Sequence, residues 1–128
     1  MTQHARAAAY MKKAARALAG ARLLLAAEDC EGACNRAYYA MFDAAHAALL
    51  AAHVHVPDAA IKTHSGLIGA FGKYLVQGQQ VEAELGRALN KVQRLRQLAD
   101  YTGDTISLAD ATWAVQQAEA FVAAIRAT

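Results

Sequence analysis

Alanine makes up about a quarter of this 128-residue chain, which contains one proline and eight glycines. Alanine has the highest helix propensity of all residues and lets neighbouring helices approach closely. Apolar residues also recur at steps of three and four, as in the stripe formed by Tyr10, Ala14, Leu18, Ala21 and Leu25. These features predict an all-α fold. A chain of this length is expected to form a single domain, over residues 1–128.

Turn and capping signals divide the chain into five expected helices, over residues 6–27, 31–53, 65–76, 80–101 and from 107 onward. Residues 54–58 contain the only proline and predict a loop. Glycine at 103 suits a helix C-terminus, and Ser107 with Asp110 resembles a capping box. Short connections favour antiparallel neighbours. The predicted architecture is an up-down helical bundle of four long helices plus one short helix.

The charge of the chain is unevenly distributed, although its net value is only +2. Five cations precede the first acidic residue, Glu28: they are Arg6, Lys12, Lys13, Arg16 and Arg22. A basic first helix either contacts a phosphate backbone or an acidic protein, or forms a solvated face balanced by acids elsewhere. The net charge by itself does not indicate a nucleic-acid-binding protein.

Two cysteines, Cys30 and Cys34, stand four residues apart at the start of the second expected helix. This spacing suits neither an unstrained disulfide nor a zinc site, so we expect buried thiols and neither a metal nor a cofactor. No stretch is long and apolar enough to span a membrane, and the N-terminus lacks the apolar run of a signal peptide. We therefore expect a cytoplasmic protein without a membrane partner.

A polar stripe follows one side of the second expected helix and consists of Arg36, Tyr39, Asp43, His46 and His53. The opposite side is apolar and includes Tyr38. The stripe is either the solvated outer face of the bundle or the lining of a groove that binds RNA or a nucleotide. Tyrosine offers a stacking surface and a hydroxyl, and histidine titrates near neutral pH.

Arg96 faces the apolar arc of the helix expected over residues 80–101, between Leu85 and Leu89 in helical projection. A guanidinium stays charged in proteins and is costly to bury without a partner. Asp100 follows on nearly the same side. The two residues form either an ordinary intrahelical pair or a device that points Arg96 at a phosphate. His64, just before the third helix, either contacts a phosphate or makes a structural hydrogen bond.

Three sequence blocks resemble the signature blocks of HEPN domains (higher eukaryotes and prokaryotes nucleotide-binding). They are Asn35-Arg36-Ala37-Tyr38-Tyr39-Ala40-Met41-Phe42, Lys62-Thr63-His64-Ser65-Gly66 and Arg96-x-x-Ala99-Asp100-Tyr101. The similarity runs in order across nearly the whole chain and includes residues 118–122. It is closest to the small stand-alone bacterial HEPN proteins that are found beside minimal nucleotidyltransferases. The resemblance implies a bundle of four or five helices that commonly dimerises.

The resemblance also implies a function. Many HEPN domains are metal-independent ribonucleases and act as toxins that a nucleotidyltransferase neutralises. Arg96 matches the arginine of their catalytic motif, whereas Asp100 and Tyr101 occupy the segment where the motif histidine is expected. Tyr101 also matches a tyrosine that receives adenylyl groups from the partner in related toxins. The implied catalytic set is Arg96, Asp100, Tyr101 and His64, in a homodimer.

Two alternatives remain open at the level of the sequence. The absence of the motif histidine equally suits a non-catalytic helical subunit that binds a nucleotide or a nucleotidyltransferase. A plain helical dimerisation domain is the third reading.

Overall fold

The computed structural model describes residues 2–53, 62–103 and 105–128, apart from the side chains of residues 101 and 102. Every regular element in these ranges is helical, which confirms the all-α class. The elements are α1 (Gln3–Ala26), α2 (Cys30–Ala51), α4 (His64–Ala70), the π-helix η1 (Phe71–Val76), α5 (Ala83–Thr102) and α6 (Leu108–Ala127). The loop predicted at residues 54–58 lies outside the described residues.

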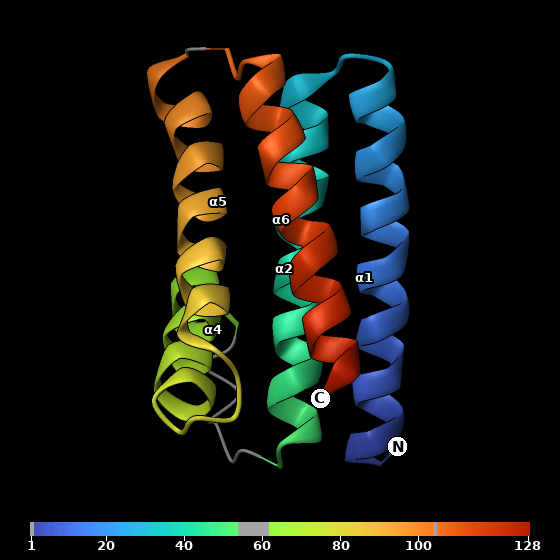
Figure 1. Ribbon diagram of the computed structural model, residues 1–128, viewed down its shortest axis with the longest axis vertical. Coiled ribbons are helices and arrows are strands. Elements are labelled where there is room, and N and C mark those ends of the chain that lie inside the picture. The colour runs from blue at the N-terminus through green and yellow to red at the C-terminus, as the bar shows by residue number, and fades with distance from the viewer. Residues whose placement is uncertain (1, 54–61, 104) are drawn as a thin grey trace.

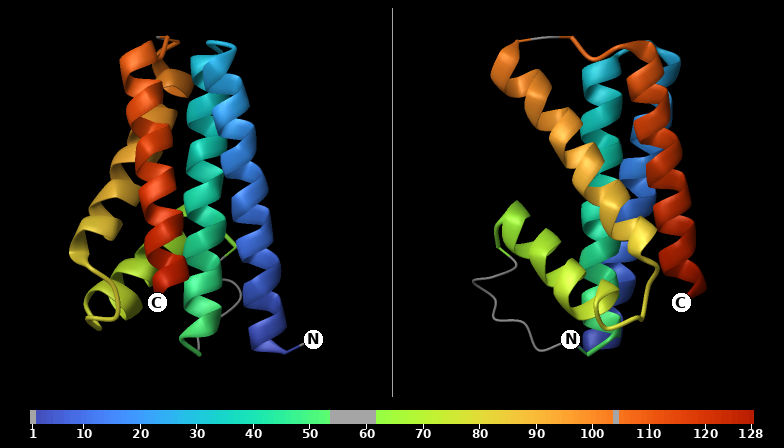
Figure 2. Two further views of the ribbon diagram at one scale, coloured as in Figure 1. Left: turned by 45° about the vertical axis from the view of Figure 1, so that its right-hand side comes forward. Right: turned by 60° about the vertical axis from the view of Figure 1, so that its left-hand side comes forward.

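The four long helices run up and down along one long axis (Figure 1). α1, α2 and α6 lie side by side, whereas α5 crosses them at an angle, and α4 with η1 packs near the start of α5 (Figure 2). The predicted bundle of four long helices and a short one is therefore confirmed. The end of α1, the start of α2, the end of α5 and the start of α6 all meet at one end of the bundle.

α2 is the central helix, because α1, α5 and α6 all pack against it. Nearly every residue from Ala37 to Leu50 is buried, and many of these are alanines that allow close helix contacts. The largest side chains of the core include Tyr38, Phe71 and Phe121, which are completely buried. The apolar core thus surrounds the helix that also carries the predicted polar stripe.

The observed elements differ from the predicted ones in the short helix and at the start of α5. The segment expected as one α-helix over 65–76 changes at Phe71 into a π-helical turn, in which the Gln77 N–H donates to the Gly72 carbonyl five residues earlier. The spacing of Phe71 and Leu75 keeps both side chains buried in this wider turn. α5 begins at Ala83 rather than at 80, after a backbone turn with a positive φ of 59° at Gln79.

The predicted capping signals at both ends of the 103–107 connection are confirmed. Gly103 closes α5 in the left-handed conformation with φ of 71°. The Ser107 hydroxyl accepts a hydrogen bond from the Asp110 N–H at 3.0 Å and starts α6.

None of the helices in residues 2–53, 62–103 and 105–128 combines the length and the apolar run needed to cross a bilayer.

Replacing Ser107 with alanine is expected to lower the free energy of unfolding by about 1 kcal/mol, because the first turn of α6 loses its side-chain acceptor. Urea denaturation monitored by circular dichroism measures the change. Thr105→Ala is the matched control, since Thr105 is also exposed and caps no helix. Equal stability of the two variants would contradict the capping role of Ser107.

Candidate active site

Arg96 is held between α5 and α2 by uncharged partners. Its side chain is only 18% exposed. The Nε atom donates to the Gln93 side-chain oxygen at 3.2 Å, and Nη1 donates to the Asn35 side-chain oxygen at 3.5 Å. The guanidinium carbon lies 4.7 Å from the ring centre of Tyr38 and 5.9 Å from that of Tyr39. These contacts orient the charge, and none of these four partners carries an opposite charge.

Asp100 compensates the charge of Arg96 only weakly. The Asp100 carboxylate lies 4.0 Å from Nη1 of Arg96, and its side chain is 70% exposed. Because the carboxylate is exposed and the separation is at the limit for an ion pair, the pair contributes little to stability. Both residues line a hollow of about 410 Å³, together with Asn35, Tyr39 and a second carboxylate, that of Glu31. We call this space the Arg96 hollow, and it offers an anion a charge that is already oriented.

His64, at the start of α4, lies beside Tyr38 and near the charge of Arg96, although it does not line the Arg96 hollow itself. Its Nδ1 atom lies 2.6 Å from the hydroxyl of Tyr38, and the two rings stack with centroids 5.4 Å apart. Burial raises the pKa of Tyr38 well above its usual range, so the phenol stays protonated. With the proton on Nδ1, Nε2 of His64 is free to accept a proton; the other tautomer makes Nε2 a donor. Tyr38 thus positions a histidine that can serve as base or acid.

Two causes lower the pKa of His64 below its ordinary value. Partial burial disfavours the charged imidazolium, and the nearby positive charge of Arg96 disfavours it further. His64 is therefore neutral at pH 7, which is the form that a general base requires.

Arg96→Gln is expected to raise the pKa of His64, because the substitution removes the neighbouring positive charge. The ring-proton shifts of His64 in an NMR titration report this pKa directly. Arg94→Gln removes an exposed charge of the same helix and is expected to leave it unchanged. A His64 pKa that responds equally to both substitutions would show that Arg96 has no specific influence.

The residues of the polar stripe predicted on α2 do not share one surface, because those from Arg36 to His46 lie in two different hollows and against α1. Only Tyr39 lines the Arg96 hollow. Arg36, Tyr39 and Asp43 line a second hollow of about 350 Å³ that opens between α2 and α1. His46 stacks on Tyr10 of α1, with ring centroids 3.9 Å apart. Asp43 and His46 are each only 8% exposed, so the solvated-face reading is wrong for both of them.

Burial dominates the electrostatics of these two residues. It raises the pKa of Asp43, against the opposing effect of Lys13 and Arg36. It lowers the pKa of His46, and the charges of Arg6 and Lys13 add to this shift. The Nε2 atom of His46 is buried without a hydrogen-bond partner among the described residues. His46 is therefore a packed residue beside α1 and does not join the Arg96 hollow.

Three residues of the site were not among the predicted site residues: Tyr38, Asn35 and Gln93. The helical pattern placed Tyr38 on the apolar side of α2, and its side chain is indeed buried. The pattern gave no indication that the Tyr38 hydroxyl bonds to His64. Asn35 and Tyr38 both belong to the first sequence block, which was the available signal. The Tyr101 side chain lies outside the described residues, so its catalytic and modification roles remain predictions.

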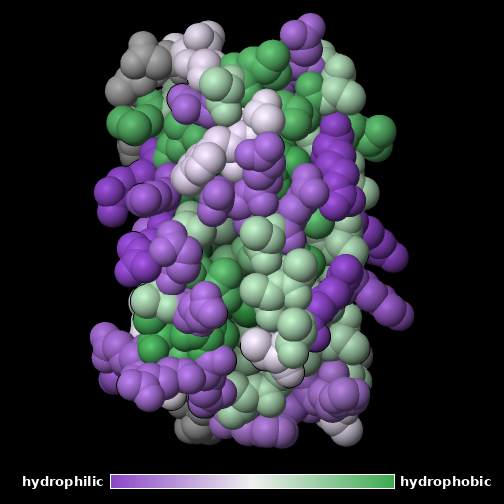
Figure 3. Space-filling model, viewed as in Figure 1, coloured by the Kyte–Doolittle hydropathy of each residue, from purple (hydrophilic) through white to green (hydrophobic). Residues whose placement is uncertain are grey.

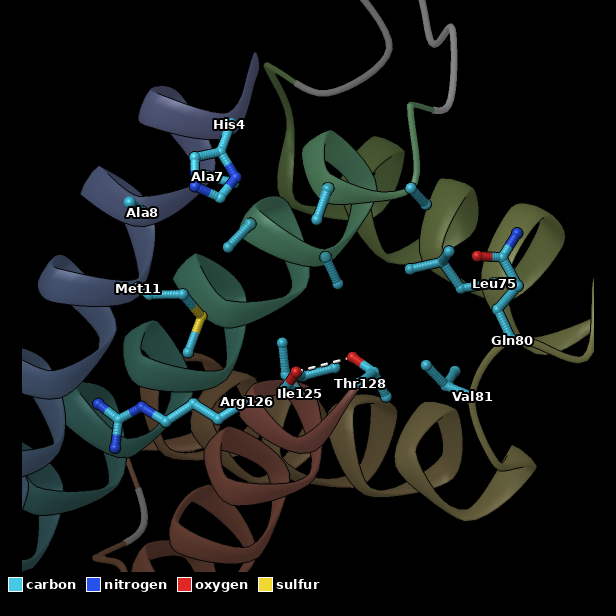
Figure 4. A pocket seen from close by; sticks show the side chains of 14 residues that line it. His4, Ala7, Ala8, Met11, Leu75, Gln80, Val81, Ile125, Arg126 and Thr128 are labelled. Atoms are coloured by element: carbon cyan, nitrogen blue, oxygen red, sulfur yellow. Dashed lines mark hydrogen bonds between the residues drawn. The ribbon is translucent and has the colours of Figure 1, made fainter. Parts of the chain in front are cut away.

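Other groups provide less chemistry. Burial raises the pKa of the Cys34 thiol to about 11, so the thiol is protonated at neutral pH and is a poor nucleophile. No cluster of metal-binding side chains occurs in the described ranges. A cavity of about 510 Å³ between α1, α2 and the C-terminus is lined mainly by apolar side chains, and the Thr128 hydroxyl beside it already donates to the Ile125 carbonyl (Figure 4).

The fold and this site together define the class of protein. It is a helical bundle whose site contains an arginine held by polar groups and a histidine bonded to a tyrosine. This site lies where the central helix meets its neighbours. The HEPN domain family model matches residues 7–127, and the chain belongs to the HEPN family.

Several relatives cover most of the chain. A protein of Methanocaldococcus jannaschii named "Putative toxin MJ0605" is 36% identical over 109 residues, which span 85% of this chain and 78% of that protein. A "UPF0332 protein" of Thermotoga maritima is 33% identical over 119 residues, spanning 91% of this chain and 85% of that protein. "Putative toxin MJ0142" of M. jannaschii is 30% identical over 110 residues, spanning 86% and 66%.

Proposed function

We propose that this chain is the toxin of a toxin–antitoxin pair: a metal-independent endoribonuclease that acts as a homodimer and is neutralised by a nucleotidyltransferase. The observation that carries the proposal is Arg96, a largely buried guanidinium oriented by neutral groups toward an open hollow. Membership of the HEPN family and relatives named as toxins support the same role.

The site suits RNA cleavage by the neighbouring 2′-hydroxyl. His64 removes the proton of this 2′-hydroxyl. The 2′ oxygen then forms a bond to phosphorus, and the bond from phosphorus to the 5′ oxygen breaks. The leaving oxygen takes a proton from water, and the products carry a 2′,3′-cyclic phosphate and a 5′-hydroxyl. Arg96 stabilises the negative charge that develops on the phosphoryl oxygens. Asp100 keeps the guanidinium aligned without cancelling its charge.

Dimerisation is proposed at the end of the bundle where α5 ends and α6 begins. Leu23 near the end of α1 is 74% exposed, and Leu108 at the start of α6 is 48% exposed. Large exposed apolar side chains near one end favour a subunit contact there. The face formed by α1, α5 and α6 shows hydrophilic and hydrophobic side chains mixed along its whole length (Figure 3). A dimer through this end places two Arg96 hollows near each other.

The antitoxin is proposed to act on Tyr101, which follows directly after Asp100. We expect a transferred adenylyl group to add bulk and a negative phosphate near the end of α5, and to compete there with the phosphate of the substrate. Mass spectrometry of the subunit after incubation with the partner and ATP tests this modification.

One observation favours a second candidate function. Aspartate stands at position 100, where the resemblance leads us to expect the motif histidine. A non-catalytic subunit that binds a nucleotide or a nucleotidyltransferase is compatible with this residue.

Expression of the chain with and without a nucleotidyltransferase from the adjacent reading frame distinguishes the two candidates. The toxin proposal predicts growth arrest and RNA fragmentation when the chain is expressed alone, and recovery on co-expression. Normal growth with intact RNA, combined with stable co-purification of the two proteins, would favour the non-catalytic subunit.

A further inference from the structure

A second cationic site lies beside the Arg96 hollow, between α1 and α2. Lys13 and Arg16 of α1 and Arg36 of α2 line a hollow of about 350 Å³, with the buried carboxylate of Asp43 and the rings of Tyr39 and Phe42. We call this space the basic hollow. Three positive charges against one negative charge leave it strongly cationic even when Asp43 is ionised.

The cations of the basic hollow are not engaged in ion pairs. The pairs formed within the described part of the chain involve Arg22, Arg87 and Arg96, so no carboxylate lies within 4.0 Å of Lys13, Arg16 or Arg36 there. Lys13 and Arg16 stand three residues apart on the same side of α1, which is unfavourable for like charges. An anionic ligand between them removes this repulsion.

The side chains of two cations of the basic hollow rest against α1. The Arg36 side chain passes close to Gly20, where a built Cβ atom would lie 3.7 Å from its Nε atom. Lys13 rests over Tyr10, with its Nζ atom 5.2 Å from the ring centre. Both stems are thus supported by α1 and its contacts, and the charged ends remain exposed.

The two hollows adjoin at a single aromatic side chain. Tyr39 lines both of them, with Arg96 on one side and Arg36 on the other. Single-stranded RNA is typically bound by cationic grooves that follow the backbone and by aromatic rings on which bases stack. An acidic protein surface needs no such ring beside a cationic hollow, so the arrangement favours RNA.

We propose that the basic hollow binds a backbone phosphate of single-stranded RNA that flanks the bond positioned at Arg96, with a base stacked on Tyr39 between the two sites. This inference deepens the proposed function and rests on it. It adds Lys13 and Arg16 of α1 to the RNA-binding surface and accounts for two of the five cations of the first helix.

The test is the salt dependence of RNA affinity. The probe is a short fluorescent single-stranded RNA with methylated 2′-hydroxyls, which the full-length protein cannot cleave, and fluorescence anisotropy gives Kd at several KCl concentrations. Each lost phosphate contact is expected to reduce the slope of log affinity against log salt by about 0.7. Because the basic hollow binds one phosphate, the double variant Lys13→Gln/Arg16→Gln is expected to reduce this slope by about 0.7 relative to the unmodified protein.

The double variant Arg6→Gln/Lys12→Gln is the matched control, because it removes two exposed charges of α1 that do not line the basic hollow. It is expected to change the slope much less. Equal slopes for the two double variants, or no RNA binding by the unmodified protein, would overturn the inference.

Two further arms identify the ligand. If Lys13→Gln/Arg16→Gln weakens binding of inorganic phosphate or a 5′-mononucleotide as much as that of the RNA, the site binds a free phosphate species and the assignment to a strand is wrong. If the variant keeps its RNA affinity but no longer binds the nucleotidyltransferase, the surface serves a protein instead.

Failure of this inference differs from failure of the proposed function. If the protein cleaves RNA but its RNA affinity is unaffected by Lys13→Gln/Arg16→Gln, the ribonuclease proposal stands and the inference about the basic hollow is wrong. If the protein binds RNA through Lys13 and Arg16 without cleaving it, the inference about the basic hollow stands and the ribonuclease proposal is wrong.

Discussion

Arg96→Ala is expected to abolish growth inhibition when the chain is expressed without its antitoxin. The substitution removes the only charge that Gln93, Asn35 and Tyr38 jointly orient toward the Arg96 hollow. Loss of one group that stabilises a transition-state charge typically reduces the rate by about 10²–10³-fold. Colony counts after induction and the integrity of total RNA measure the effect.

Arg94→Ala is the control for this experiment. Arg94 is a cation of the same helix two residues away, and its side chain is exposed. It is expected to leave growth inhibition intact. Similar expression levels and circular dichroism spectra of both variants establish that Arg96→Ala still folds. Full toxicity of Arg96→Ala would contradict the role assigned to this guanidinium.

His64→Ala is expected to reduce the rate of RNA cleavage by about 10²–10⁴-fold, the usual contribution of a general acid or base. Because the pKa of His64 lies below its ordinary value, the neutral base persists at neutral pH and is lost only as the pH falls through that lowered pKa. The unmodified protein is thus expected to lose activity on the acidic side. This acidic limb is expected to be missing from the residual activity of His64→Ala.

His4→Ala provides the comparison, since His4 is exposed near the N-terminus and lines the separate cavity beside the C-terminus. It is expected to keep both the rate and the acidic limb. Tyr38→Phe preserves the buried ring but removes the hydroxyl that contacts His64. A shifted acidic limb in Tyr38→Phe is the expected sign of a positioning role. An unchanged pH profile in His64→Ala would assign the proton transfer to another group.

Much of the fold follows from local features of the sequence. Alanine content and three-four spacing predict the helices, and glycine at 103 and Ser107 predict where α5 ends and α6 begins. The inward position of Arg96 also follows from helical periodicity, because its neighbours on that face are Leu85 and Leu89. These features depend on residues close together in the chain, so one sequence is sufficient to find them.

The composition of the site depends on contacts between distant residues. The Tyr38–His64 bond joins residues 26 positions apart, and the Asn35–Arg96 bond joins residues 61 positions apart. Helical periodicity fixes which side of α2 each residue occupies, but not which helix packs on that side. The polar stripe was therefore predicted as one surface, whereas α1 covers His46 and Asp43 and leaves Tyr39 beside α5.

The central claim is tested most directly by incubating the purified protein with a defined single-stranded RNA in the presence of EDTA and analysing the ends of the products. The account predicts cleavage without added metal, with 2′,3′-cyclic phosphate ends, and its loss in Arg96→Ala. RNA that stays intact with the unmodified protein, or cleavage that persists unchanged in Arg96→Ala, would contradict it.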